Sequence, residues 1–398
     1  MNELVLSRLR RARYLAAKPD TGFAIFVAAA LIVSIVEYLK GIKPLYGANY
    51  FHYNNYIIFK SSLFNLLNQV NLYAPHPEQY FDLYKYSPSF PLLMAPMAWF
   101  PDWLGLTLWN AINTLPLFFA IMLLPNLSAG VRTTISWLVI VDVMTSLHNA
   151  QSNGIMAGLF ILAFVLMERE RLVWAALCIV LMIYIKLFGA VALLLFALYP
   201  GKLKSALAVV GWTIVIGLAP LLLVDPTYLA QQYSGWLKLL SADVSRSYGV
   251  SLLGLIQSWT GISPPKLWPL IAGAVVLILP VVRFNQFKSF AFRLMLLASV
   301  LIWVVIFNHK AESSTFVIAS CGVALWYFAD RRSLFHHILL VASLLLVTFS
   351  PTDLFPPFIR GHIIVPLKLK ALPPVVIWLA LQYELLRGRR IGFKEIEG

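Results

Sequence analysis

The sequence is poor in charged residues and in cysteine. Asp, Glu, Lys and Arg make up 12% of its 398 residues, about half the usual share of a soluble domain. A water-soluble globule of this size needs many more charges to cover its surface, so the composition argues against a soluble enzyme or nucleic-acid binder. Cys178 and Cys321 both lie in apolar runs without metal-ligand spacing. They indicate neither a disulfide framework nor a zinc site.

Motifs for nucleotide, metalloprotease and dinucleotide chemistry are also absent. The chain has no phosphate-binding glycine loop, no HExxH and no dinucleotide fingerprint. We therefore expect no cofactor, with a divalent-metal requirement left open. The energy for any reaction must come from an activated substrate or a gradient.

The composition is instead that of a polytopic membrane protein. Apolar residues make up 60% of the chain, which at roughly 20 residues a span is enough for about twelve crossings. We predict an all-α integral membrane protein in which residues 1–398 form one transmembrane domain of about 12 (11 to 13) helices. Apolar runs cover 22–39, 105–124, 134–147, 154–167, 172–184, 187–199, 205–224, 267–282, 291–307, 316–328, 335–350 and 372–386.

Basic clusters between these runs set the orientation. The net charge of +14 is explained by Lys and Arg at cytoplasmic helix ends, near anionic lipid, rather than by nucleic acid. We expect a protein of the cell inner membrane, with a cytoplasmic basic N-terminus at 1–21 and a cytoplasmic tail at 387–398. The polar segments 41–90, 225–265 and 351–371 then lie on the extracytoplasmic face and imply an outward-facing cavity.

Two features of the first outer loop stand out. Residues 49–73 carry apolar side chains at helical spacing, which is typical of an amphipathic helix in the membrane interface. Its polar start includes Asn54 and Asn55. The stretch 87–100 is apolar but interrupted by three prolines, so it is either a half-helix that dips into the membrane or a true crossing.

Four polar groups between apolar runs are candidate site residues. Asp82 and Lys85 form either a surface ion pair or a pair that orients a hydroxyl and meets a phosphate. The turn from His148 through Gln151 to Asn153 either satisfies helix ends or binds sugar hydroxyls. Lys186 sits between two apolar runs, where a charge is costly unless it snorkels to the interface or serves a function.

The fourth group is the segment 308–315, which combines an imidazole, an ammonium and a carboxylate in His309, Lys310 and Glu312. A turn needs only polar residues, whereas general acid-base or phosphate chemistry needs such a set. We therefore place this segment at the active centre.

The order of motifs resembles the polytopic glycosyltransferases of the GT-C superfamily, and most closely glycosyltransferase family 87, whose members resemble polyprenyl-phosphate-mannose-dependent α-mannosyltransferases. The resemblance covers about residues 20–330. It rests on Tyr84-Lys85-Tyr86-Ser87-Pro88, Trp109-Asn110-Ala111-Ile112-Asn113, Ala150-Gln151-Ser152-Asn153, Ile185-Lys186-Leu187-Phe188 and Ser251-Leu252-Leu253-Gly254-Leu255.

One departure from the family pattern concerns the catalytic base. Where the family carries a loop aspartate that deprotonates the acceptor, this chain has Asn55, and an amide is no general base. Either Asp82 or Glu78 takes the role, or Glu312 does with His309 beside it, or the chemistry is altered or lost.

The resemblance implies transfer of a sugar from a polyprenyl-phosphate donor to a glycolipid or glycan hydroxyl in envelope biosynthesis. The expected sugar is mannose. Lys85, Lys186, Lys310 or Arg246 would meet the phosphate, and Tyr84, Tyr86 and Trp109 would pack against sugar or prenyl chain. Two alternatives remain: a secondary transporter or flippase of lipid-linked sugars, and a non-catalytic membrane subunit.

Overall fold

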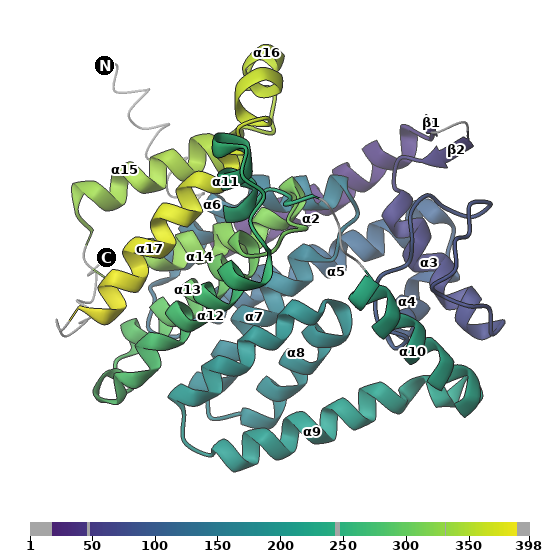
Figure 1. Ribbon diagram of the computed structural model, residues 1–398, viewed down its shortest axis with the longest axis horizontal. Helices are drawn as coiled ribbons and strands as arrows, with labels where there is room; N and C mark the ends of the chain where they lie inside the picture. Colours follow the sequence, from purple (N-terminus) through teal and green to yellow (C-terminus); the bar gives the residue numbers. More distant parts are fainter. Residues whose placement is uncertain (1–17, 46–47, 243–246, 331, 388–398) are drawn as a thin grey trace.

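The computed structural model describes residues 18–45, 48–242, 247–330 and 332–387, and helices dominate it (Figure 1). The first part of the chain contains α2 (Pro19–Leu39), the antiparallel strands β1 (Ile42–Leu45) and β2 (Ala48–Phe51), α3 (Asn54–Leu67), α4 (Phe90–Ala98), α5 (Asp102–Met122), α6 (Ala129–His148) and α7 (Asn153–Glu168). Ile42 pairs with Phe51 at the open end of the two-stranded ribbon.

The middle of the chain contains α8 (Leu172–Ile185), the 3-10 helix η1 (Leu187–Leu198), α9 (Lys202–Leu218), η2 (Ala219–Leu222), α10 (Pro226–Ala242), α11 (Leu252–Thr260), α12 (Leu267–Ile278), η3 (Leu279–Val282) and η4 (Phe284–Gln286). The last part contains α13 (Phe290–Ile306), η5 (Ser313–Thr315), α14 (Phe316–Ala329), α15 (Leu334–Ser343), η6 (Leu344–Phe349), α16 (Pro357–Ile359), η7 (Arg360–Ile364), η8 (Leu369–Ala371) and α17 (Leu372–Leu386).

The structure confirms an all-α membrane protein. Five helical segments in the described residues are long and apolar enough to cross a membrane: 19–39, 102–122, 129–148, 202–222 and 369–386. Seven further apolar segments are shorter. A helix of 14 residues such as α8 reaches only about 21 Å, less than the roughly 30 Å of a bilayer core. The count of about twelve spans therefore stays a prediction.

The proline-interrupted stretch forms a short helix. Within 87–100, α4 has nine residues, with Pro91 near its start and Pro96 inside it. Nine residues span about 14 Å, so α4 is too short to cross a bilayer. Of the two alternatives for this stretch, the structure favours the half-helix.

The first-loop helix is present as α3, and it is packed against protein. Tyr56, Phe59, Leu63 and Leu66 are almost fully buried, and α3 packs on α4. The segment 225–265 also holds regular structure, since α10 and α11 lie within it. In Figure 1, α3, α4 and α10 lie at the right-hand side of the molecule, whereas α11 is seen over the middle of the bundle.

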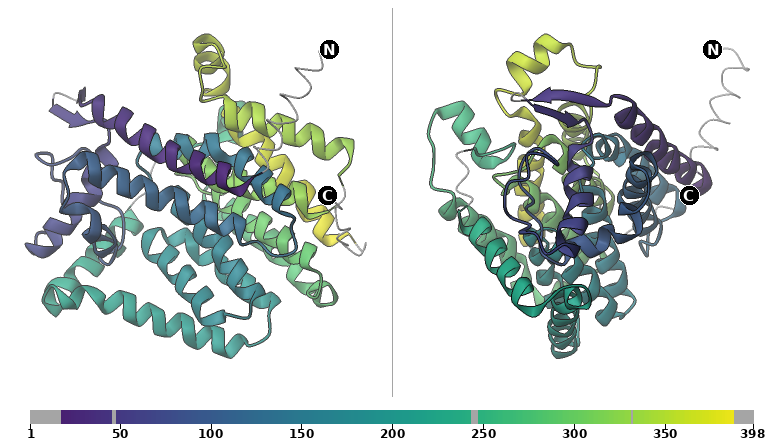
Figure 2. Two further views of the ribbon diagram at one scale, coloured as in Figure 1. Left: turned by 180° about the vertical axis from the view of Figure 1, so that it is seen from behind. Right: turned by 90° about the vertical axis from the view of Figure 1, so that its right-hand side faces the viewer.

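The core lies between α13 and α14, with α5, α6 and α7 around them. Every residue of α13 from Ala291 to Ile306 is buried except Arg293, and Arg293 is paired with Glu168 through two hydrogen bonds of 2.6 and 2.7 Å. By contrast, α9 lies at the edge of the bundle (Figures 1 and 2). Its apolar residues are largely exposed, as expected of a helix that faces lipid.

Candidate active site

Polar segments far apart in the sequence meet at one place in the fold. The Asn55 amide donates to the carbonyl of Asn149 at 2.8 Å, and the Tyr86 hydroxyl lies 3.1 Å from that of Ser152. The Asn153 amide donates to the Ser314 carbonyl at 3.0 Å. The first loop, the 148–153 turn and the 308–315 segment therefore form one polar cluster.

Lys186 is the cation at the centre of this cluster. α8 ends at Ile185, and Lys186 adopts an extended backbone before η1 begins, which breaks the helix and points the side chain toward the 148–153 turn. Its ammonium donates to Asn153 Oδ1 at 2.7 Å and to Gln151 Oε1 at 3.4 Å. It also lies 5.9 Å from the centre of the Tyr86 ring. Both partners are neutral, so the positive charge is not cancelled by them.

Two buried aromatic side chains hold the loops of the cluster in place. Tyr84 and Trp109 have no exposed surface. The Tyr84 hydroxyl donates to the Ser87 carbonyl at 2.6 Å, and the Trp109 indole donates to the Ala150 carbonyl at 2.9 Å. These two residues fix the loops that carry Tyr86 and the 148–153 turn rather than presenting a surface to a ligand. Burial raises the pKa of Tyr86, so its hydroxyl stays protonated at neutral pH.

Glu312 is the exposed carboxylate of the cluster. Its side chain accepts a hydrogen bond from the Thr315 amide, while its own amide donates to the Thr315 hydroxyl at 3.2 Å, forming a capping box on η5. In the described part of the chain no cation forms an ion pair with it. Its charge nevertheless acts on both Lys186 and Tyr86. Glu312 is thus held in place without being neutralised.

The rest of the 308–315 segment is fixed by α11 and the loop before it. The Val250 amide donates to the Ala311 carbonyl at 2.7 Å, and Gly249, with φ +56°, packs so closely that a Cβ there would meet the Ala311 and His309 carbonyls. Burial and nearby Lys266 lower the pKa of His309, so its ring is neutral at neutral pH.

Asp82 and Lys85 lie near Lys310, which precedes Glu312 by two residues. The Lys85 ammonium donates to both carboxylate oxygens of Asp82, at 2.8 and 3.0 Å. Burial and the Lys85 charge lower the pKa of Lys310, while Asp82 raises it. The Asp82 carboxylate is therefore already neutralised, whereas the group as a whole carries excess positive charge.

The remaining candidates have local partners. Asn54 forms hydrogen bonds with both the amide and the carbonyl of Phe81 and so anchors the first loop. His148 Nδ1 lies 2.6 Å from Glu37 Oε1, and the same oxygen accepts from Lys40. Arg246 lies outside the described residues.

Sequence reasoning missed three buried charged residues, two of which, Glu37 and Asp142, lie inside predicted apolar runs. Glu37 stands near the end of the first span and pairs with His148. Asp142 and Lys370 are buried and 3.9 Å apart, although 228 residues separate them in the sequence. A signal was present, because a charge within an apolar run is costly and marks a functional position by default.

In the described part of the chain, no three His, Cys, Asp or Glu side chains are grouped so that they could hold a metal ion. The arrangement instead offers an exposed carboxylate, several ammonium groups and amide side chains. This set can take a proton from a hydroxyl, stabilise an anionic leaving group and orient a polar substrate.

Comparison with known proteins agrees with this chemistry. No match was found among curated proteins. The family model for glycosyltransferase family 87 matches residues 84–351, about two thirds of the chain. The match includes Tyr86, the 148–153 turn, Lys186 and the 308–315 segment, and it leaves out Asn54, Asn55 and Asp82. The chain belongs to glycosyltransferase family 87 and is a membrane glycosyltransferase.

Proposed function

We propose that this glycosyltransferase transfers a mannosyl unit from a polyprenyl-phosphate donor to a hydroxyl group of a glycolipid or glycan, with inversion at the anomeric carbon. The observation that carries the proposal is that Glu312 and Lys186 belong to the same polar cluster, which is joined by the hydrogen bonds of Asn153 to Lys186 and to Ser314. Among the residues that the structure describes, Glu312 is an exposed carboxylate without an ion-pair partner, and Lys186 is an ammonium whose hydrogen-bond partners are neutral amides. A base and a leaving-group cation are the two groups that such a displacement needs.

The donor class follows from what the chain contains and lacks. The sequence has no phosphate-binding glycine loop for a nucleotide, and its apolar helices imply substrates that reach the site through the bilayer. A lipid-linked sugar phosphate fits both observations. If the basic clusters are cytoplasmic, as the positive-inside rule indicates, the polar cluster faces the extracytoplasmic side of the cell inner membrane.

In this mechanism Glu312 accepts the proton of the acceptor hydroxyl as its oxygen attacks the anomeric carbon. The new glycosidic bond forms on the face opposite the phosphate, and the old carbon–oxygen bond breaks. The lipid phosphate departs with the electron pair of that bond. A single displacement of this kind inverts the anomeric centre. Lys186 stabilises the negative charge on the leaving phosphate, and Lys85 and Lys310 add to the positive potential there.

Glu312 is preferred to the other base candidates for physical reasons. The Asp82 carboxylate is already engaged in a close ion pair with Lys85, whereas the Glu312 carboxylate has no such partner among the described residues. Asn55 carries an amide that donates to Asn149 and has no basic group. His309 is neutral at neutral pH and follows as the second candidate, because it precedes Glu312 by three residues on the same segment.

The test compares Glu312→Gln with Asp82→Asn in purified protein supplied with polyprenyl-phosphate-mannose and a glycolipid acceptor. The glutamine oxygen can still accept from the Thr315 amide, so the capping box and the fold are retained. We expect Glu312→Gln to lower turnover about 10²- to 10⁴-fold, the usual contribution of a general base.

Asp82→Asn disturbs only an ion pair whose two side chains are about half exposed, and we expect a much smaller loss. Wild-type turnover in Glu312→Gln would remove Glu312 as the base. Retention of the anomeric configuration in the product would contradict the single displacement. Absence of any transfer from polyprenyl-phosphate sugars would contradict the donor class.

A further inference from the structure

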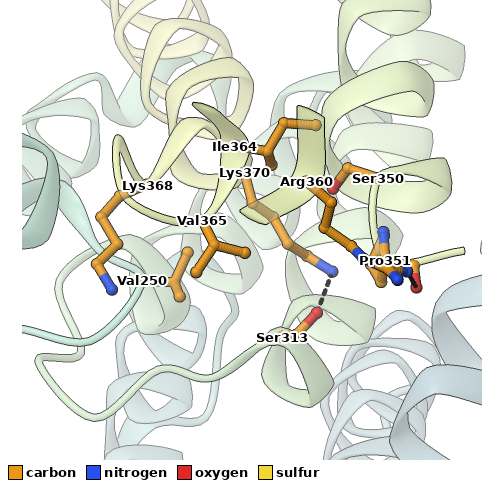
Figure 3. Close-up of a pocket in the computed structure, with 9 residues that line it drawn as sticks. All are labelled: Val250, Ser313, Ser350, Pro351, Arg360, Ile364, Val365, Lys368 and Lys370. Carbon is orange, nitrogen blue, oxygen red and sulfur yellow. Dashed lines mark hydrogen bonds between the residues drawn. The ribbon is translucent and has the colours of Figure 1, made fainter. Parts of the chain in front are cut away.

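A second cationic site lies beside the active site and was not indicated by any motif. A cavity of about 330 Å³ lies at the junction of η5, η6, η7 and η8, and Figure 3 shows the residues that line it. Its volume falls at the lower end of the range for small-molecule sites. Three basic side chains line it: Arg360, Lys368 and Lys370. Val250, Ile364 and Val365 supply an apolar wall.

Lys370 is held at this cavity by buried partners. Its side chain is 7% exposed, and its ammonium donates to the Ser313 hydroxyl at 2.8 Å (Figure 3). It lies 5.0 Å from the centre of the Phe316 ring. A lysine buried to this degree needs a counter-ion.

That counter-ion is Asp142, which has no exposed side-chain surface and lies 3.9 Å from the Lys370 ammonium. Its Oδ2 atom accepts from Ser320 and Thr348, at 2.9 and 2.8 Å. Its Oδ1 atom has no hydrogen-bond partner among the described residues. The carboxylate therefore stabilises the Lys370 ammonium electrostatically, without a direct hydrogen bond to it. The ammonium can then make a further close contact at the cavity.

The cavity carries more positive than negative charge. The Lys368 ammonium has no hydrogen-bond or ion-pair partner in the part of the chain that the structure describes. Arg360 donates to the Pro351 carbonyl at 3.2 Å and lies 3.9 Å from the fully exposed carboxylate of Asp353. Three cations thus face two carboxylates, one of which is in solvent. Such a site favours an anion, and its apolar wall favours one that carries a hydrocarbon chain.

The cavity and the polar cluster share the short helix η5. The Ser313 hydroxyl accepts from Lys370, while the carbonyl of the next residue, Ser314, accepts from Asn153 of the polar cluster. Glu312 directly precedes these two residues. Lys370, which lines the cavity, therefore contacts the residue that follows the proposed base.

From these observations we infer that the Arg360–Lys368–Lys370 cavity binds the phosphate group of a lipid. The inference rests on the proposed function, in which a lipid-borne donor, and a glycolipid when that is the acceptor, reaches Glu312 from the bilayer. The Lys186 ammonium serves the phosphate that leaves, and the cavity holds a lipid phosphate beside it. Prenyl phosphates and glycerophospholipids share this chemistry.

Binding is measured on the full-length protein in phosphatidylcholine nanodiscs, by native mass spectrometry and by calorimetry. The probes are farnesyl phosphate, farnesol, phosphatidylinositol and inorganic phosphate. Lys368→Met leaves the Asp142–Lys370 pair intact, and Lys204→Met, at the exposed start of α9, is the matched control. We expect Lys368→Met to weaken binding of a lipid phosphate about tenfold, as for one charge-assisted hydrogen bond, with no change in the control.

Lys370→Met alone leaves Asp142 buried without its counter-ion, so the double variant Asp142→Asn/Lys370→Met accompanies it. We expect the double variant to fold and to bind lipid phosphate at least tenfold more weakly than wild type. Preference for farnesyl phosphate or for phosphatidylinositol identifies the source of the phosphate, and either result supports the site. Equal binding of farnesol, or of inorganic phosphate, would overturn it.

Wild-type affinity in both Lys368→Met and the double variant would also overturn the inference, even if Glu312→Gln abolishes transfer and the proposed function stands. Conversely, the protein could bind lipid phosphate through Lys368 and Lys370 and yet fail to use polyprenyl-phosphate sugars. That result would leave the cavity assignment intact and refute the proposed donor.

Discussion

Replacing Lys186 by methionine tests the electrostatic part of the mechanism. Methionine keeps much of the apolar length of the side chain and removes the charge and the hydrogen bonds to Asn153 and Gln151. Both of these partners are neutral amides in a partly buried site. Leaving their side-chain oxygens without the Lys186 donor costs about 1–3 kcal/mol of folding free energy. The variant should therefore fold.

The expected effect on catalysis is larger. A unit charge about 4 Å from the leaving phosphate, at an effective dielectric constant of about 20, contributes about 4 kcal/mol. If this contribution is made mainly in the transition state, its removal lowers turnover about 10³-fold. This agrees with the loss of roughly 10²- to 10³-fold seen when one oxyanion-stabilising group is deleted from an enzyme.

The assay is single-turnover transfer of mannose from a saturating polyprenyl-phosphate-mannose donor, so that the loss appears in the chemical step and not in donor binding. Lys186→Arg retains the charge and is expected to lie between wild type and Lys186→Met. Lys204→Met controls for a lost surface charge. Wild-type single-turnover rates in Lys186→Met, or an equal loss in Lys204→Met, would refute the role assigned to Lys186.

Three further predictions concern packing, a buried ion pair and pH. Gly154→Ala places a Cβ 2.2 Å from a backbone carbonyl of α5 and should destabilise the fold by about 1–3 kcal/mol. Gly211 has open space around it, so Gly211→Ala should not destabilise the fold. Thermal unfolding in detergent measures both variants. Arg293→Met leaves the Glu168 carboxylate, which is 6% exposed, without its cationic partner and should lower the free energy of unfolding by about 3–5 kcal/mol. An unchanged melting temperature would contradict the assigned pair. Because the pKa of His309 is lowered from 6.5 in the folded state, protonation favours the unfolded chain. The melting temperature of wild type relative to His309→Gln should therefore fall as pH drops below 6.5 and stay level above it.

The sequence by itself determined the class of the molecule and the positions of most helices. Long apolar runs with few charges leave only a helical membrane protein, since backbone groups in a bilayer must be paired within each helix. The same logic placed turns at 148–153 and at Lys186, where polar residues interrupt the runs, and α6, α7, α8 and η1 end or begin there. These features depend on residues near one another in the chain.

Helix lengths within the polar loops were less predictable. The segment 225–265 looked like a loop but contains α10 and α11, because helices that pack on protein need no run of apolar residues long enough to span a membrane. The proline-interrupted stretch 87–100 was compatible with two structures, and the length of α4 decided between them, because its nine residues are too few to cross a bilayer.

Only the tertiary structure decided which polar residues face one another. It paired His148 with Glu37, committed Asn54 to Phe81, and placed Tyr84 and Trp109 behind the site. It also joined Asp142 to Lys370 across 228 residues. The physical reason is that a buried charge must find its partner in space, and the packing of helices from both halves of the chain determines which partner is within reach.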